Sequence, residues 1–181
     1  VQARWGHANE KFSWLTQVQA IALDGHFGIE QGGRGWGGFF LNFNGTAGIW
    51  RRKAIDDAGG WNADTLTEDL DLSYRAQLAG YRIEYCIDVE VPAEIPPDIP
   101  AFKSQQRRWA KGSIQTAMKL LPKVMKAPIS PFRKYQAAVH LTAYMVHPLM
   151  FTIAILAVPL VGVWETIRAP LSIFALMGLL L

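Results

Sequence analysis

The sequence has a single cysteine, Cys86, which excludes an internal disulfide and favours a reducing compartment. Acidic residues are also missing over a long interval, since none occurs between Asp98 and Glu165. All charge within that interval is basic, which suits anionic lipid head groups or the cytoplasmic side of a membrane segment. A nucleic acid is the competing partner for such a run, but the apolar segment that follows favours lipid, so we expect no nucleic acid partner.

Charge of either sign is absent from residues 136–164. About 20 apolar residues cross a bilayer as a helix, so this stretch predicts a transmembrane helix over 136–164. Residues 165–181 end in an apolar run that is too short to cross alone, and we expect them to begin a second, truncated transmembrane helix. The sequence therefore predicts a multi-pass membrane protein. Because it starts without Met or a signal peptide, we expect it to be an internal piece of a longer chain.

Three helices are expected before the membrane segment. Apolar residues recur at three- and four-residue steps over 11–27 and again over 65–79, which predicts two amphipathic helices. The Gly-rich run 31–38 is expected to end the first of them. A third, basic helix follows a proline-rich link, and we expect Gly112 and Pro122 to bend or break it.

Extended segments are expected between these helices. Residues 39–43 are rich in β-forming side chains, and the turn signal Asn44-Gly45 predicts that residues 46–51 return as a second extended segment. Residues 81–91 form a further strand candidate. Helices and strands therefore alternate through the first half of the chain.

Two adjacent carboxylates, in Thr67-Glu68-Asp69, lie at the start of the helix predicted over 65–79. Exposed N–H groups and the positive end of the helix dipole stabilise carboxylates at such a position. One interpretation is structural, because Thr65 and Glu68 fit a capping box. The other is chemical: Asp69, kept ionised by the same donors, takes a proton from a hydroxyl as a general base.

Gln105, Arg108 and Trp109 have the spacing i, i+3 and i+4, so they project from one face of a helix. Arginine can bind diphosphate oxygens with two donors, glutamine can donate to the same group, and tryptophan can lie against the apolar face of a sugar ring. The competing interpretation is an interfacial helix, with Trp109 in the aromatic belt and Arg107 and Arg108 on lipid phosphates. One sugar-transfer site would explain both this motif and the carboxylates.

These two motifs, in this order and before an apolar span, resemble the membrane-embedded family 2 glycosyltransferases that make β-linked polysaccharides, such as cellulose, mannan and glucomannan synthases. Phe43-Asn44-Gly45-Thr46 resembles the short loop that borders the acceptor sugar in this group. Val1-Gln2-Ala3-Arg4-Trp5 resembles a segment of its cellulose-synthase-like members. The resemblance implies an α/β fold, in which residues 1–100 are the C-terminal part of a GT-A-like (Rossmann-like) catalytic domain and residues 101–135 form the Gln-x-x-Arg-Trp-bearing and interfacial helices.

The resemblance also implies roles for the residues that match. Asp69 would deprotonate the acceptor hydroxyl, and Glu68 would shape the site around it. Gln105 and Arg108 would bind the donor diphosphate. The acceptor sugar would contact four residues, namely Trp109, Asn44, Gly45 and Thr46.

The implied reaction is an inverting transfer of a hexose from a UDP- or GDP-sugar to a growing β-linked glycan. It would take place at a bacterial inner membrane or in the Golgi, among membrane lipids, with the catalytic part on the cytoplasmic side. The family holds Mg²⁺ or Mn²⁺ on an Asp-x-Asp upstream of the motifs seen here. This chain lacks that region, so we expect no metal site in it and no activity from this piece alone.

Two other functions remain compatible with the sequence. The first is a lipid glycosyltransferase that adds one sugar to ceramide or a diacylglycerol. The second is a non-enzymatic membrane transport or anchoring protein, in which the motifs are helix caps and interfacial residues. Product length would separate the first from a polysaccharide synthase, and nucleotide-sugar binding would exclude the second.

Overall fold

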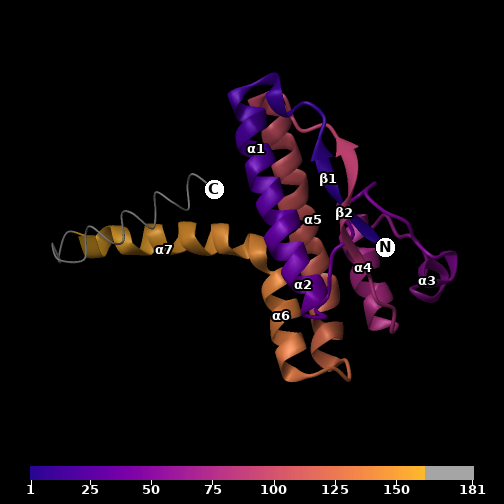
Figure 1. The fold of residues 1–181 in the computed structure, drawn as a ribbon. Coiled ribbons are helices and arrows are strands. Elements are labelled where there is room, and N and C mark those ends of the chain that lie inside the picture. The colour runs from indigo at the N-terminus through magenta and orange to yellow at the C-terminus, as the bar shows by residue number, and fades with distance from the viewer. Residues whose placement is uncertain (162–181) are drawn as a thin grey trace. The chain divides into compact units, whose positions relative to one another are not determined.

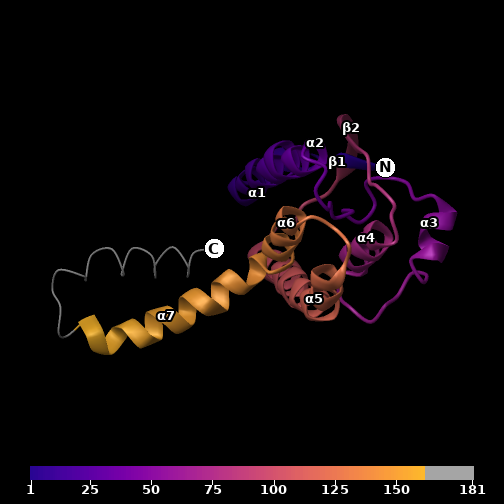
Figure 2. The ribbon, with the colours of Figure 1, turned by 90° about the horizontal axis from the view of Figure 1, so that it is seen from below.

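The computed structural model describes residues 1–161, and the second membrane helix predicted at 165–181 lies outside them. The chain divides after Leu141 into two compact units, which are described separately. The first unit combines a small sheet with several helices (Figures 1 and 2), so the predicted α/β content is confirmed. Its elements are β1 (Gln2–His7), a 3₁₀ turn (Glu10–Phe12), α1 (Trp14–Gly25), a π-helical segment (His26–Gln31), α2 (Gly32–Trp36), α3 (Arg52–Asp57), α4 (Glu68–Leu78), β2 (Tyr85–Ala93), α5 (Ile99–Lys126) and α6 (Pro131–Leu141).

β1 and β2 pair as a two-stranded parallel sheet (Figure 1). Gln2 pairs with Tyr85, and after an irregularity between Ala3 and Arg4 the register resumes with Arg4 opposite Glu90. Parallel strands need a long crossover, which here contains α1 to α4. The sheet thus brings the N-terminus beside a segment from the middle of the chain.

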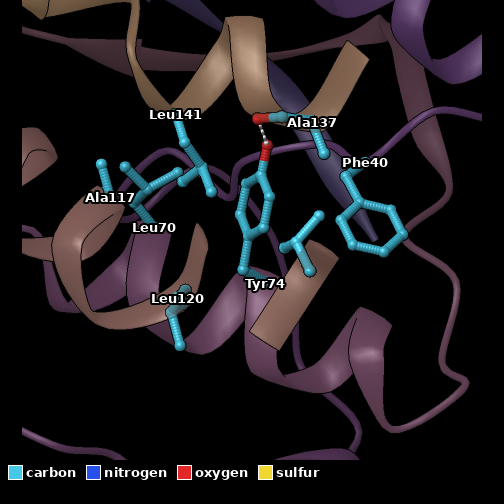
Figure 3. Packing of buried hydrophobic residues seen from close by; sticks show 8 residues of the cluster. Phe40, Leu70, Tyr74, Ala117, Leu120, Ala137 and Leu141 are labelled. Carbon is cyan, nitrogen blue, oxygen red and sulfur yellow. Dashed lines mark hydrogen bonds between the residues drawn. The ribbon is translucent and has the colours of Figure 1, made fainter. Parts of the chain in front are cut away.

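The core of the first unit lies where α4, α5 and α6 meet (Figure 3). Tyr74 of α4 is fully buried, and its hydroxyl donates to the carbonyl oxygen of Ala137 in α6 over 3.4 Å. Leu120 and Val124 of α5 are buried against it. The apolar face of the helix predicted over 65–79 is therefore the face that holds α4 in place.

The Gly-rich run 31–38 does not end the first helix as expected. α1 continues through the π-helical segment into α2, which ends at Trp36. Glycine is needed within α2 for close packing, because a β-carbon on Gly35 would lie 3.2 Å from the β-carbon of Tyr85 in β2. Glycine has a low helix propensity, but residues 32–36 are helical because packing against β2 favours the helix.

Residues 39–43 and 46–51 were expected to be strands, and the structure shows neither as one. A single antiparallel bridge, between Gln2 and Gly48, joins the second segment to β1. The first segment is extended, but its backbone is hydrogen-bonded to side chains of α4. Side-chain partners thus replace a neighbouring strand.

α5 runs unbroken for 28 residues, although Pro122 lies within it. The helix is therefore not broken at Pro122 as one of the two expected outcomes had it, and the affected turn faces outward, since Met118, one turn earlier, is 77% exposed. α5 lies beside both α4 and α6 (Figure 2). It therefore carries the Gln105 to Trp109 motif towards the start of α4.

The transmembrane helix predicted over 136–164 is not one continuous helix. Its first residues belong to α6, and the second unit continues with a 3₁₀ turn (Ala143–Met145) and α7 (Val146–Val161). Pro148 has no N–H to extend α7 backwards, and its ring crowds the preceding turn, which explains a break there. Among residues 1–161 no single helix has both the length and the hydropathy to span a bilayer, although Pro131–Leu141 and Ala143–Ala157 meet both requirements when they are taken together.

Candidate active site

The carboxylate motif lies at the N-terminus of α4, but not in the predicted capping box. The residue preceding the helix is Thr67, and its side chain makes no capping hydrogen bond. The box would have required Thr65 in that position, whereas Thr65 lies two residues before it. The structural interpretation of Glu68 as a capping residue is therefore wrong.

Thr67 instead contacts α5. Its hydroxyl lies 3.3 Å from the hydroxyl of Thr116, and both are buried. A β-carbon on Gly112 would lie 2.6 Å from Cγ2 of Thr67 and 2.7 Å from its backbone nitrogen, which is closer than a β-carbon packs against such atoms. The absent side chain at Gly112 is thus what lets the helix with Trp109 touch the helix with Asp69.

Asp69 accepts two backbone hydrogen bonds. Its Oδ1 accepts from the N–H of Leu70 over 2.8 Å, and its Oδ2 accepts from the N–H of Gly45 over 2.9 Å. Burial raises the pKa of the Asp69 carboxyl above the usual value of an aspartate, and the nearby charge of Glu68 adds to the rise, while the two N–H donors lower it. A carboxylate with a raised pKa is a stronger base, as general base catalysis near neutral pH requires.

The Asn44-Gly45-Thr46 sequence forms a tight turn above Asp69. Gly45 has a φ of +57°, a left-handed conformation that glycine adopts without strain, and the N–H of Ala47 donates to the carbonyl oxygen of Asn44 over 3.2 Å. Gly45 and Thr46 are exposed. The turn therefore presents backbone and hydroxyl groups to solvent directly beside the Asp69 carboxylate.

Trp5 connects this turn to Trp109. Its indole N–H donates to the carbonyl oxygen of Asn44 over 3.3 Å, and its ring centre lies 6.3 Å from that of Trp109 at an interplanar angle of 44°. Both tryptophans are half-buried. A contact path thus runs from Asp69 through Gly45, Asn44 and Trp5 to Trp109.

Sequence reasoning gave Trp5 no role of its own, although it lies in the Val1 to Trp5 segment that carried part of the resemblance. A buried cluster of charged side chains at α4 was not predicted from the sequence either. Arg75 donates through Nε to Oδ2 of Asp71 over 2.7 Å, and Lys119 of α5 lies 2.8 Å from Oδ1 of Asp71. The i, i+4 spacing of Asp71 and Arg75 was the signal available.

Gln105 and Arg108 lie on α5 just before Trp109. Arg108 is exposed and Gln105 is half-buried. Within residues 1–161 neither side chain takes part in a hydrogen bond or an ion pair, so both are available to a ligand, and neither is joined to Asp69 by a direct contact. Their role at the diphosphate stays a prediction.

A divalent cation does not fit the residues described here. Across residues 1–161 no group of three or more His, Cys, Asp or Glu side chains is arranged to hold a metal ion. Asp69 and Asp71 have the Asp-x-Asp spacing, but Asp71 is fully buried and paired with Arg75 and Lys119. No step of the chemistry below is therefore assigned to a metal.

Comparisons with known proteins show the family of this chain. The chain belongs to a family described as Glycosyl transferase family group 2, which it matches over residues 14–181. It is 38% identical over 174 residues to a probable glucomannan 4-beta-mannosyltransferase 7 of Oryza sativa subsp. japonica, covering 96% of this chain and 28% of that protein. It is 41% identical over 126 residues to glucomannan 4-beta-mannosyltransferase 1 of the same plant, covering 70% of this chain and 24% of that protein. The chain spans about a quarter of the length of these relatives.

Proposed function

We propose that this chain forms part of the active site of an inverting glycosyltransferase, which transfers a hexose from a nucleotide sugar to a growing β-linked polysaccharide, and that it contributes residues to both the acceptor site and the donor diphosphate site. The observation that carries the proposal is the hydrogen bond between Oδ2 of Asp69 and the N–H of Gly45. It holds a carboxylate of raised pKa beside an exposed turn. A sugar hydroxyl that reaches this turn is within reach of a base.

The chemistry is a single displacement. The acceptor oxygen forms a bond to the anomeric carbon of the donor sugar as the bond from that carbon to the diphosphate oxygen breaks. The proton of the acceptor hydroxyl passes to Asp69, and the configuration at the anomeric carbon inverts. Asp69 thereby makes the attacking oxygen more nucleophilic in the transition state.

Side chains of α5 bind the donor diphosphate and the ring of the acceptor sugar. The Arg108 guanidinium, exposed and unpaired among residues 1–161, binds the oxygens of a UDP or GDP diphosphate and offsets the charge that develops as it leaves. Gln105, one helical turn earlier, donates to the same group. Trp109 lies against the apolar face of the acceptor sugar, supported by Trp5.

The complete enzyme is proposed to be a multi-pass membrane protein with a GT-A-like catalytic domain on the cytoplasmic side, in a bacterial inner membrane or in the Golgi. A divalent cation, Mg²⁺ or Mn²⁺, would be held by ligands outside the residues described here. Mannan or glucomannan is the favoured product, because both named relatives are glucomannan 4-beta-mannosyltransferases. A lipid acceptor is the runner-up.

The test uses the full-length protein in membranes, supplied with radiolabelled UDP- and GDP-hexoses. The proposal expects a labelled product that is a long β-glycan, cleaved by an enzyme specific for β-mannan or β-glucan. A single labelled sugar on an extractable lipid would instead identify the lipid glycosyltransferase. Calorimetry that detects no binding of any nucleotide sugar would favour the transport or anchoring protein.

A further inference from the structure

A regular ladder of hydrogen bonds joins residues 41–45 to α4. The Gln77 side chain binds both backbone polar groups of Leu41. Its Oε1 accepts from the Leu41 N–H over 3.0 Å, and its Nε2 donates to the Leu41 carbonyl oxygen over 2.7 Å. The Phe43 N–H donates to Oγ of Ser73 over 2.7 Å. The bond from Gly45 to Asp69 is the third rung of the same ladder.

The ladder follows from matched spacings. Four residues along an α-helix advance about 6 Å, and two residues along an extended chain advance about 6.6 Å. Side chains at every fourth position of α4 therefore meet the backbone at every second position of the extended segment. The two run in opposite directions, because Leu41 meets the end of α4 and Gly45 meets its beginning.

Ser73 is the central rung and is fully buried. Its hydroxyl accepts from Phe43 and donates to the backbone carbonyl oxygen of Asp69 over 2.5 Å. One side chain thus fixes the distance between the backbone of Phe43 and the backbone of Asp69. Phe43 precedes the Asn44-Gly45-Thr46 turn directly, so Ser73 also determines where that turn lies above the Asp69 carboxylate.

We propose that Ser73 and Gln77 are positioning residues for the glycosyl transfer: they hold the acceptor turn in register with Asp69. This inference rests on the proposed function. Neither side chain touches substrate in this account, and each acts through the peptide groups that it holds. Without the Ser73 hydroxyl, the Phe43 N–H is buried with no acceptor, and the segment shifts to find one.

The positioning role is tested by a double-mutant comparison in the full-length protein. Ser73→Ala and Gln77→Ala are each expected to lower kcat by about tenfold to a hundredfold, the cost of a misplacement of about 1 Å, while KM for the nucleotide sugar stays near the wild-type value. Gln77 is half-buried and Ser73 is fully buried, so the Gln77 variant is expected to disturb folding less than the Ser73 variant does. Gln17→Ala, at an exposed position of α1, is the matched control and should change neither constant.

The same substitutions are then made in an Asp69→Asn background. If the ladder acts through Asp69, neither substitution lowers kcat further there, because the group that it positions is already gone. An equal loss of kcat in both backgrounds, or a lower melting temperature with unchanged kcat, would overturn the positioning role. Normal turnover of Asp69→Asn alone would instead remove the proposed function, so the two failures are distinguishable.

Discussion

Gly112 of α5 lies directly against Thr67, the residue that precedes α4, with no room for a side chain between them. Thr67 begins the motif that contains Asp69, and Gly112 follows Trp109 by one helical turn. The two motifs are far apart in the sequence, and this contact brings the helices that carry them together. We therefore expect the geometry of the site to depend on the residue at position 112.

Gly112→Ala should destabilise the protein by about 1–3 kcal/mol, because the new methyl group overlaps both the side chain and the backbone of a buried residue. The matched control is Gly33→Ala in α2, where no atom lies within 4 Å of the added carbon. Alanine at that exposed helical position should leave stability unchanged or raise it by up to about 1 kcal/mol. Denaturant unfolding of both variants tests the pair, and equal effects would contradict the close contact.

Asp71→Asn should destabilise the protein by about 3–5 kcal/mol, because it leaves the Arg75 guanidinium and the Lys119 ammonium facing a neutral amide at a fully buried position. Asp56→Asn is the control, since Asp56 pairs with Arg52 in α3 where both side chains are largely exposed. An exposed pair contributes little, so this variant should unfold almost as the wild type does. A similar loss of stability in the two variants would contradict a buried role for Asp71.

The pH dependence of kcat/KM should show the raised pKa of Asp69. The base must be ionised to accept a proton, so activity falls as the pH falls through that pKa. Because burial raises the pKa, the midpoint of the acidic limb should lie above about 3.9, the ordinary value for an aspartate. A midpoint at or below that value would show that a different group titrates.

Trp109→Ala should raise KM for the glycan acceptor by about twofold to tenfold, the contribution of an aromatic contact, and leave the affinity for the nucleotide sugar unchanged. Trp14→Ala is the control, because Trp14 of α1 is 76% exposed. Initial rates at varied acceptor concentration measure the effect. A loss of affinity for the nucleotide sugar with a normal KM for the acceptor would show that Trp109 contacts the donor and not the acceptor.

Local patterns were enough to predict two of the long helices and one strand. The apolar spacing over 65–79 and the basic helix after the proline-rich link correspond to α4 and α5, and residues 81–91 overlap β2. These predictions succeeded because each pattern reports which face packs into a core. The family could also be predicted from the sequence, because the motifs that indicate it are defined by the identity and the order of their residues.

The errors arose where tertiary contacts override local preference. The β-forming residues 39–43 are extended, but the side chains of Ser73 and Gln77 take the place of a neighbouring strand. The Gly-rich run is helical because β2 packs against it at Gly35. The contact between Trp5 and Trp109 joins residues that lie 104 positions apart in the sequence, and no local signal reports such a pairing.

We propose Asp69 as the base of a glycosyl transfer. The most direct test of this role is the turnover of Asp69→Asn in the full-length protein, measured beside its affinity for the nucleotide sugar. If Asp69 is the base, turnover falls by about 10² to 10⁴-fold with donor affinity nearly unchanged, since only proton transfer is lost. Near-normal turnover would contradict it.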